Sequence, residues 1–503
     1  MNRVYYFLFV LLFIAPITLV AQSLKFSDFD RGDSRDMNFE IIGKVNNNIL
    51  VYKNIRWKHK INIYDNDMQT RETINLDFIP EKTFNIDFVA YPDFFYMIYQ
   101  YQKGRILHCM MVKMDANAKK ISEPVELDTT QIPVMSDNKI YTTIYSEDRQ
   151  KIMLFKIQTR NQKFNLVTLL FDNRFTLINK NRHVTDYNER RDNYDNFLLG
   201  NDGTFVFTFD KQSGNRDNSN ELGLIIKAPL QNTFTYQNIE LDNKYIDEVK
   251  LKIDNLNNRC IINTFYYKKN RGSIEGLFTF IWDKGNEKMY ASQFTELYDS
   301  IRFEAKRDGM LRFAFDNFFI RQVIVKKDGG FILAAEDFTS DTRGSNNSWN
   351  RYNYLYNPNS LSSGAYYYNP YTGYYRPYSS LNNQSTRYYY ENILVLSINK
   401  AGKTEWSKVI HKDQFDDDED NFMSFSTMAS RGEIHFLFNS DKKNQIISDQ
   451  SLSPDGTIKR NPTLKSEQKG YEFMPALSKQ VGTNQIIIPC TYRNNICFAK
   501  VEF

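Results

Sequence analysis

The feature that most constrains the fold of this chain is a short unit that recurs eight times along its 503 residues. Each unit is a polar turn followed directly by an apolar and aromatic run of strand length, roughly 5–6 residues. The turns are Asn46-Asn47-Asn48, Pro92-Asp93, Asp148-Arg149-Gln150, Asn201-Asp202-Gly203, Asn257-Asn258-Arg259, Asp328-Gly329-Gly330, Ser430-Arg431-Gly432 and Gly482-Thr483-Asn484. The runs begin at Ile49, Phe94, Ile152, Phe205, Cys260, Phe331, Ile434 and Ile486. Repeats of several tens of residues are typical of solenoids, propellers and arrays.

The residue patterns within the unit indicate β-strands. The run at 204–209 alternates threonine or valine with phenylalanine, whereas the runs at 94–99 and 152–155 are continuously apolar, as in strands buried on both faces. A second turn signal rich in Asp, Asn and Gly follows most runs, for example at 65–66 and 455–456, and a polar alternating strand comes after it. Each unit is therefore interpreted as four strands, the composition of a propeller blade.

We predict an all-β fold, a β-propeller of eight four-stranded blades. The last unit supplies three strands, near 471–477, 486–491 and 496–501, and residues 23–26 can add the missing outer strand. The N- and C-terminal strands would then close the ring together. Pro489 interrupts the last apolar run, because proline removes a ladder hydrogen bond. Seven blades, if the N-terminal unit is irregular, and two stacked β-sandwich domains are the alternatives.

The N-terminus has the pattern of a secretory signal peptide over residues 1–21. Arg3 gives it a positive start, residues 4–20 are apolar and uncharged, and a small residue precedes the expected cleavage site before Gln22. The rest of the chain contains no linker rich in Pro, Gly or Ser that would mark a domain boundary. We therefore expect residues 22–503 to form a single propeller domain.

The alternative to cleavage is an uncleaved membrane anchor on a sensor domain. The apolar stretch is short for this purpose, because a spanning helix needs about 20 residues. After cleavage, no later stretch approaches about 18 uncharged apolar residues, so we predict no transmembrane segment in the mature chain. The expected location is the periplasm, the outer membrane or the cell surface.

Charge and cysteine content exclude some classes of protein. The formal net charge is only +4, with 64 basic and 60 acidic residues interspersed, so nothing resembles a nucleic-acid-binding stripe. Four cysteines in a chain of this size make no disulfide scaffold. Cys490 and Cys497 flank Arg493-Asn494, and they would face each other if those two residues form a hairpin turn. The two alternatives for this pair are a disulfide and two buried free thiols.

The sequence contains no catalytic motif that we can assign. It has no Gly-x-Ser-x-Gly elbow, no His-Glu-x-x-His and no phosphate-binding glycine loop. His108 and His435 lie within strand patterns, so we interpret them as core or rim residues. The acidic run at 416–420 lacks the alternation of a calcium loop, and we interpret it as a solvated loop between blades. We therefore predict no metal site and no cofactor. A catalytic carboxylate pair contributed by distant blades remains an alternative.

A tyrosine-rich segment at 340–392 interrupts the sixth unit between its second and third strands. It holds 13 of the 33 tyrosines, with Asn, Ser, Pro and Gly between them. Disordered segments are usually poor in aromatic residues, whereas binding loops favour tyrosine together with Ser, Gly, Asn and Arg. A disordered polar loop is the alternative to a binding loop. The predicted partner-binding residues are Tyr352, Tyr354, Tyr356, Tyr366, Tyr367, Tyr368, Tyr371, Tyr374, Tyr375, Tyr378 and Arg376.

The segment after this insertion carries a family resemblance. It reads Glu391-Asn392-Ile393-Leu394-Val395-Leu396-Ser397-Ile398-Asn399-Lys400-Ala401-Gly402-Lys403-Thr404-Glu405-Trp406-Ser407-Lys408. An apolar strand, an Asn-x-x-Gly turn and Glu-Trp-Ser-Lys resemble blade hairpins in secreted propeller-like proteins of Bacteroidota. The Ala-Gln cleavage site and the Asn/Lys/Tyr-rich composition fit that group. Some envelope propellers of the group accompany outer-membrane machines, including the type 9 secretion translocon, which implies a scaffold or accessory role by analogy.

These observations favour a non-enzymatic propeller of the cell envelope. It would act as a protein-binding scaffold or as an accessory subunit of an outer-membrane complex, and its partner would be an envelope or outer-membrane protein. The alternative is a glycan-binding or glycan-active propeller, whose ligand would stack on the same tyrosines. The composition of the insertion does not separate the two.

Overall fold

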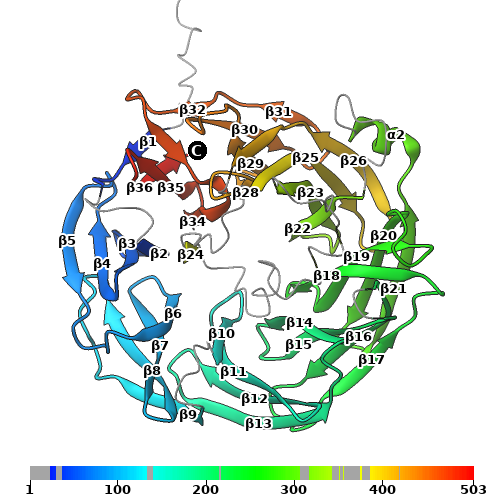
Figure 1. The fold of residues 1–503 in the computed structure, drawn as a ribbon, viewed down its shortest axis with the longest axis horizontal. Coiled ribbons are helices and arrows are strands. Elements are labelled where there is room, and N and C mark those ends of the chain that lie inside the picture. Colours follow the sequence, from blue (N-terminus) through cyan, green and yellow to red (C-terminus); the bar gives the residue numbers. More distant parts are fainter. Residues whose placement is uncertain are drawn as a thin grey trace, which may run out of the picture.

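The computed structural model describes residues 23–29, 37–132, 140–214, 217–305, 316–342, 351, 355, 374–375, 386–417 and 420–503. These residues form a ring of antiparallel β-sheets that radiate from a common centre (Figure 1). The ring is an eight-bladed β-propeller, as the repeat predicts. In the described part of the chain, no helix combines the length and the apolar character that crossing a bilayer requires.

Each blade is built around four strands that lie side by side, with the first strand nearest the centre of the ring and the fourth at its rim. Blade 1 contains β2 (Met37–Val45), β3 (Asn48–Ile55), β4 (Lys58–Tyr64) and β5 (Thr70–Asn75), and blade 2 contains β6 (Thr83–Ala90), β7 (Phe94–Lys103), β8 (Ile106–Asp115) and β9 (Val125–Gln131). Blade 3 contains β10 (Tyr141–Tyr145), β11 (Lys151–Arg160), β12 (Lys163–Asp172) and β13 (Leu177–Asp186), and blade 4 contains β14 (Asp192–Leu199), β15 (Phe205–Gln212), β16 (Ser219–Lys227) and β17 (Thr235–Ile239). Blade 5 contains β18 (Tyr245–Asp254), β19 (Arg259–Tyr267), β20 (Gly276–Asp283) and β21 (Lys288–Glu296), and blade 6 contains β22 (Phe318–Val325), β23 (Phe331–Thr342), β25 (Thr386–Ile398) and β26 (Thr404–Ile410). Blade 7 contains β28 (Phe425–Ser430), β29 (Glu433–Asn439), β30 (Ile446–Leu452) and β31 (Ile458–Arg460).

Blade 8 and a few short elements complete the ring. Blade 8 consists of β33 (Tyr471–Phe473), β34 (Lys479–Gly482), β35 (Gln485–Tyr492), β36 (Asn495–Glu502) and β1 (Ser23–Phe26). The short elements are β24 (Tyr374–Tyr375), β27 (Gln414–Asp417), β32 (Leu464–Lys465), α2 (Asp299–Glu304) and η3 (Pro475–Leu477). Blade 6 is the one in which a long segment separates the second strand from the third.

The eight turns of the repeat are the hairpins between the first and second strands of the eight blades. Several contain a residue with positive φ, as at Asn46 (52°) and Gly203 (85°). Glycine and asparagine adopt this backbone conformation with the least strain. The apolar runs are accordingly the second strands, and β3 shows their character because its first six residues are all buried. Burial on both faces explains why these runs are continuous in the sequence.

The second turn signal is a carboxylate that binds the backbone of its own turn. In the β4–β5 turn, Asp65 Oδ1 accepts hydrogen bonds from the backbone N–H groups of Asp67 (2.8 Å) and Gln69 (2.9 Å). Asp115 and Asp172 do the same in the β8–β9 and β12–β13 turns. The acceptor satisfies two donors that the hairpin leaves unpaired, which is why aspartate recurs at this place.

The hydrophobic core lies between neighbouring blades. Between blades 3 and 4, for example, aromatic rings from both sheets pack together, and Phe164 stacks on Tyr194 with ring centroids 4.2 Å apart. Each large apolar side chain buried in this way contributes about 1.5–3 kcal/mol to stability. The blades are therefore held by a series of similar interfaces around the ring.

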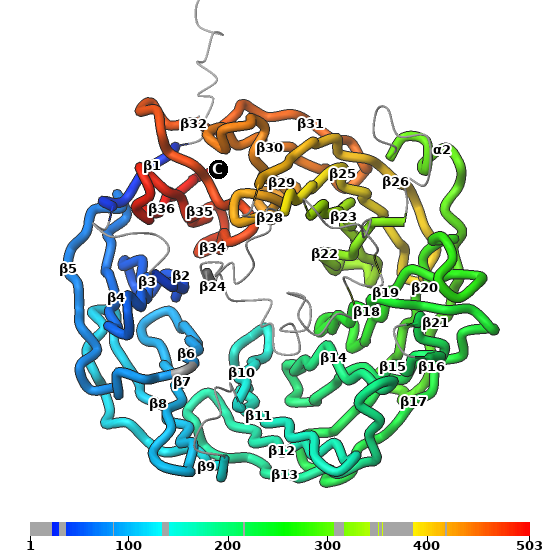
Figure 2. The backbone as a smooth tube through the Cα atoms, viewed as in Figure 1, coloured from blue at the N-terminus to red at the C-terminus, as the bar shows by residue number. Residues whose placement is uncertain are grey.

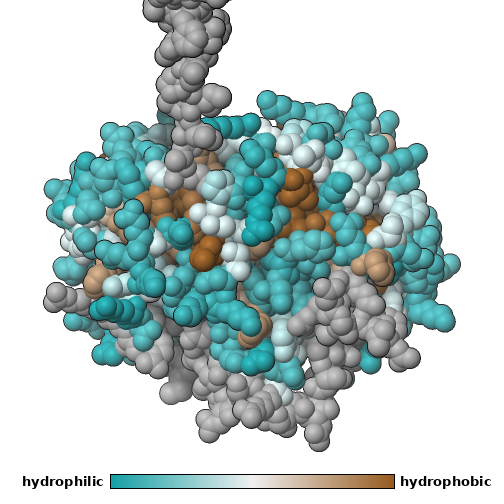
Figure 3. Space-filling model, turned by 90° about the horizontal axis from the view of Figure 1, so that it is seen from above, coloured by the Kyte–Doolittle hydropathy of each residue, from teal (hydrophilic) through white to brown (hydrophobic). Residues whose placement is uncertain are grey.

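The two ends of the chain close the ring in blade 8. Strand β1 pairs antiparallel with β36, with Ser23 opposite Glu502 and Phe26 opposite Ala499. Figure 2 shows these first and last strands side by side. The closure that the sequence predicts, with residues 23–26 as the missing outer strand, is confirmed. The rim of blades 7 and 8, seen in Figure 3, is largely hydrophilic with small apolar patches at mid-height.

Pro489 fits this blade because the inner strand is broken beside it. The strands β33 and β34 both pair with β35, and η3 separates them. Pro489 lies on β35 between the part that pairs with β33 and the part that pairs with β34. Its carbonyl accepts a hydrogen bond from the Met474 N–H at 2.9 Å. Proline has no N–H to donate, and beside Pro489 there is no continuous strand that would need to accept one.

Candidate functional site

The predicted partner-binding residues lie between β23 and β25. Tyr374 and Tyr375 are described, and their backbone forms β24, which pairs antiparallel with β2 through Glu40↔Tyr374 and Phe39↔Tyr375. Strand β24 therefore extends blade 1 toward the centre of the ring (Figure 1), although its chain segment begins in blade 6. The other predicted residues lie outside the described part of the chain: Tyr352, Tyr354, Tyr356, Tyr366, Tyr367, Tyr368, Tyr371, Arg376 and Tyr378.

The segment leaves blade 6 on an extension of the sheet, which we call the arm. The arm consists of residues 338–342 of β23, 386–390 of β25 and 414–417, which form β27. Strand β26 pairs only with residues from 393 onward, so the arm continues past the four-stranded part of the blade. Part of the region that its composition assigned to the insertion is therefore strand.

The arm is held together by charged and phenolic side chains. Arg387 binds both carboxylate oxygens of Asp417, at 2.7 and 2.9 Å. The Tyr390 hydroxyl donates to Asp420 Oδ2 at 2.8 Å. The interpretation of 416–420 as a solvated loop is thus wrong for Asp416 and Asp417, which are strand residues of β27. Pairing with Arg387 supplies the partner that this acidic edge needs.

At the start of the insertion, Arg351 lies against the inner wall of the ring. Its guanidinium binds Asp247 of β18, with Nε–Oδ2 at 2.6 Å and Nη2–Oδ1 at 3.3 Å. It also donates to the Phe318 carbonyl at 2.5 Å and stacks over the Phe319 ring at 4.0 Å. Burial disfavours the charged form, but Asp247 holds the pKa of Arg351 above its usual value. The pair is almost inaccessible, with side-chain exposures of 5% and 0%.

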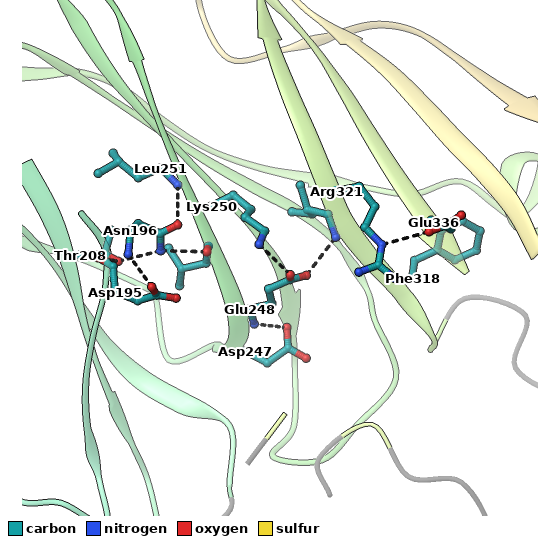
Figure 4. A network of polar contacts seen from close by, with 12 residues as sticks. Asp195, Asn196, Thr208, Asp247, Glu248, Lys250, Leu251, Phe318, Arg321 and Glu336 are labelled. Carbon is teal, nitrogen blue, oxygen red and sulfur yellow. Dashed lines mark hydrogen bonds and ion pairs between the residues drawn. The ribbon is translucent and has the colours of Figure 1, made fainter. Parts of the chain in front are cut away.

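The neighbouring carboxylate joins blade 5 to blade 6. Glu248 Oε2 accepts a hydrogen bond from the Ile320 N–H of β22 at 2.9 Å, and its other oxygen pairs with Lys250 at 3.1 Å. Figure 4 shows these contacts together with the Asp247 side chain beside them. One glutamate therefore satisfies a first-strand backbone donor of the next blade and a cation of its own strand.

A second buried carboxylate lies in blade 6, close to the base of the arm. Glu336 of β23 binds Arg321 Nε at 3.1 Å, Lys412 Nζ at 2.8 Å and the Ser424 hydroxyl at 2.6 Å. The side chains of Glu336 and Lys412 are 0% and 1% exposed. Burial lowers the pKa of Lys412, and Glu336 opposes that effect. We call Asp247, Glu248, Lys250, Arg321, Glu336, Arg351 and Lys412 the inner charge network.

Blade 4 continues this polar lining with neutral partners. Asn196 has a φ of 58° at a bulge of β14, and its side-chain amide donates to the Val249 carbonyl of blade 5 at 3.0 Å. Asp210 is buried and accepts from the Ser219 hydroxyl at 2.6 Å and from Asn193 Nδ2 at 2.9 Å. Because burial disfavours the carboxylate, the pKa of Asp210 is raised to about 7.

The geometry of the inner charge network is that of an anchor. Its buried carboxylates are paired with arginine or lysine, or with a backbone N–H, and such pairs fix positions because separating them exposes unpaired charge. Arg351 is the member that belongs to the insertion. In the described part of the chain, no three His, Cys, Asp or Glu side chains are grouped so as to hold a metal ion. The network thus ties the start of the insertion to blades 5 and 6.

The two histidines of the strand patterns are paired with carboxylates. His435 Nδ1 lies 2.9 Å from Asp449 Oδ1 in blade 7, and both residues are buried. His108 Nδ1 lies 2.6 Å from Glu126 Oε2 across the β8–β9 pair. They occupy core and rim positions away from the insertion.

Sequence reasoning missed the inner charge network, although a signal for it was present. Asp247-Glu248 and Glu336-Asp337 interrupt strand-like apolar stretches. A charged pair inside such a stretch is costly to bury unless partners are available. Two decisive partners come from within the insertion (Arg351) and from beyond it (Lys412), so spacing along the chain does not reveal them. Sixty acidic residues offered no other way to select the three carboxylates of the network.

Comparisons with known proteins identify no family for this chain. No family model matches this chain, and no curated protein matches it. Among solved structures, it is similar to prolyl oligopeptidase B from Galerina marginata, with 10% identity and a TM-score of 0.42, over 92% of this chain and 56% of that one. The chain thus spans little more than half of that enzyme.

Two further solved structures are similar at the same level. The dihydro-heme d1 dehydrogenase NirN matches with 10% identity and a TM-score of 0.38, over 93% of this chain and 72% of that one. An ulvan lyase of a new polysaccharide lyase family matches with 9% identity and a TM-score of 0.36, over 82% of this chain and 90% of that one. These likenesses carry no argument about activity. The strand topology defines this chain as a β-propeller.

Proposed function

We propose that this protein is an exported, non-enzymatic β-propeller of the cell envelope that binds a protein partner through its tyrosine-rich insertion. It would serve as a scaffold or accessory subunit of an outer-membrane complex. The observation that carries the proposal is the attachment of the insertion to the ring. Arg351 is buried against Asp247 of blade 5, and β24 pairs with β2 of blade 1.

This attachment favours a displayed binding segment over a loosely tethered loop. Binding segments work best on a rigid scaffold, because less conformational freedom is lost when the partner binds. Tyrosine supplies large amphipathic contacts at low entropic cost. Two attachment points on different blades, together with 13 tyrosines between residues 340 and 392, therefore support a protein-binding role.

The experiment is affinity purification from native envelope, comparing the parent protein with a variant in which residues 356–373 are replaced by a Gly/Ser linker of equal length. Deleting all of 340–392 would also remove strand residues of β23 and β25, so the shorter replacement is sharper. We expect the parent to co-purify with a stoichiometric envelope or outer-membrane protein and the variant to lose it. Circular dichroism and the melting temperature should stay unchanged.

A matched control replaces the exposed tyrosine Tyr298 by serine, outside the insertion. This variant should retain the partner. A parent protein recovered as a partner-free monomer would contradict the proposal, as would a linker variant that still binds. Binding of a glycan array that disappears in the linker variant would place the alternative, a glycan-binding propeller, ahead of it.

A further inference from the structure

Two of the four cysteines face each other inside blade 8. Cys490 on β35 and Cys497 on β36 are direct partners in the antiparallel register, and their Sγ atoms are 2.8 Å apart. Cys109 and Cys260 lie on β8 and β19, in blades 2 and 5. All four are buried. The pair in blade 8 is therefore the one placed for a covalent link.

The hairpin geometry suits a disulfide. Directly opposite residues of an antiparallel ladder are about 4.5–5.5 Å apart between Cα atoms, inside the range of about 4.4–6.8 Å seen for disulfides. The turn residues Arg493 and Asn494 have φ values of 50° and 63°, which make a tight two-residue hairpin. This turn fixes the register, so the two cysteines cannot slip apart. The two thiols are in direct contact, with their Sγ atoms 2.8 Å apart, so only a small movement is needed to reach an S–S bond of about 2.05 Å.

The pair lies at the place where the ring is closed. Both side chains belong to the apolar cluster of blades 7 and 8, against which Leu24 and Phe26 of β1 pack. The neighbouring Phe498 makes two hydrogen bonds with Ser27. Its carbonyl accepts from the Ser27 N–H at 2.8 Å, and its N–H donates to the Ser27 hydroxyl oxygen at 3.0 Å. Strand β36 is therefore the template on which the first strand of the chain docks, and the cysteines join β36 to β35.

We infer that Cys490 and Cys497 form a disulfide when the chain folds in an oxidising compartment, and that this bond fixes the hairpin that receives β1. Each thiol gives up its proton, and the pair gives up two electrons as the S–S bond forms. A protein disulfide or small-molecule disulfide of the compartment accepts them and is released as two thiols. Because exchange needs an accessible thiolate, the bond should form before the blade is buried.

Counting thiols tests the inference directly. The full mature chain is directed to the periplasm of a bacterial host by that host's own signal sequence, so the test is independent of the signal predicted here. The purified protein is unfolded in urea with excess iodoacetamide and no reductant, and its intact mass is measured. We expect two alkylated cysteines, Cys109 and Cys260, and four after reduction. Alkylation of all four cysteines without reduction would overturn the inference.

Trypsin gives a second readout from the same sample. Arg493 lies between the two cysteines, so cleavage places Cys490 in peptide 480–493 and Cys497 in peptide 494–500. We expect these peptides to appear as one linked species that separates on reduction. Their appearance as free alkylated peptides in the unreduced digest would also overturn the inference.

Melting temperatures with and without reductant test what the bond does. Reduction should lower the melting temperature of the parent by about 2–6 °C, because a disulfide typically stabilises by constraining the unfolded chain. Cys490→Ser should no longer respond to reductant, whereas the double variant Cys109→Ser/Cys260→Ser should respond as the parent does. An equal response in Cys490→Ser and the parent would contradict a stabilising role in blade 8. Partner binding plays no part in these measurements, so they stand apart from the proposed function.

Discussion

Blades 3 to 5 and the surroundings of blade 6 hold the ring together in different ways. In blades 3 to 5, asparagine side chains bind main-chain groups about one blade away. Asn201 Oδ1 accepts from the Asp148 N–H, and Asn255 Oδ1 accepts from the Asn201 N–H, across separations of 53 and 54 residues. Around blade 6, buried charges do the corresponding work. The Arg351–Asp247 pair links the insertion to blade 5, and Glu336, which is paired with Lys412 inside blade 6, accepts a hydrogen bond from Ser424 next to blade 7.

This difference determines where a single substitution should destabilise the ring most. A neutral hydrogen bond contributes about 0.5–1.5 kcal/mol, and water replaces it when it breaks at the surface. Removing one partner of a buried ion pair leaves an unpaired charge and costs about 3–5 kcal/mol. The regular blades are held by many small contributions, whereas blade 6, which carries the insertion, depends on a few large ones.

The largest expected effect comes from Glu336→Gln. This change leaves Lys412 buried beside a neutral amide and removes the carboxylate that the partly exposed Arg321 binds. We therefore expect the free energy of unfolding to fall by about 3–5 kcal/mol in denaturant titrations. Glu405→Gln is the matched control in the same blade, because the Lys326–Glu405 pair is partly exposed. Its cost should stay below about 1 kcal/mol. Equal losses in the two variants would remove the distinction between buried and surface pairs.

The second effect concerns the anchor of the insertion. Asp247→Asn keeps the shape of the side chain but removes the charge that Arg351 binds, so we expect a loss of about 2–3 kcal/mol. Chymotrypsin should then cut within 352–378 at least about tenfold faster, because cleavage follows the population of the opened form. Glu248→Gln, which leaves the Arg351 pair in place, should not change this rate. Unchanged cleavage in Asp247→Asn would show that Arg351 does not hold the segment.

The third effect is a pH dependence that comes from the regular side of the ring. Burial raises the pKa of Asp210 to about 7 from an ordinary 3.8, so the folded state keeps this proton when the unfolded chain has lost it. The associated stability is complete below about pH 4 and is lost as the pH rises through about 7. Near pH 8, Asp210→Asn should be more stable than the parent by about 1–2 kcal/mol in thermal or urea unfolding. Parallel stability curves for parent and variant from pH 4 to 8 would contradict this assignment.

The smallest expected effect is the loss of one neutral link. Asn255→Ala removes the acceptor of the Asn201 N–H and the donor to Glu147 at 2.8 Å. Because these groups are partly exposed and can bind water, the cost should be about 0.5–1 kcal/mol in urea unfolding. A loss as large as that of Glu336→Gln would show that the neutral links are not the weaker kind.

Much of the fold was predictable because it depends on short-range patterns. Each hairpin between first and second strands has its polar turn, and each second strand begins with a mainly apolar run, so eight turns give eight blades. Ring closure followed from a last unit one strand short and an apolar start at 23–26. The β27 strand was missed, because its acidic residues become acceptable in a sheet only when Arg387 lies opposite them.

The candidate site was less predictable, because ring geometry assembles it. Arg351 and Asp247 are 104 residues apart and belong to different blades. Lys412 reaches Glu336 from the far side of the insertion. No periodicity of the sequence brings such residues together. The composition of the insertion indicated that it was unusual, but not which residues attach it to the ring.

The pairing of β1 with β36 also has a consequence for how this chain folds. Ser23 and Glu502 are 479 positions apart, and they meet across one ladder. Contacts between residues so far apart in the sequence form slowly, because the intervening chain must lose conformational entropy before the contacts contribute any stabilisation. Seven blades can form in succession as hairpins appear, but the eighth must wait for both termini. We therefore expect a late kinetic phase in refolding in which the ring is nearly complete and the edge of β36 is still open to another strand.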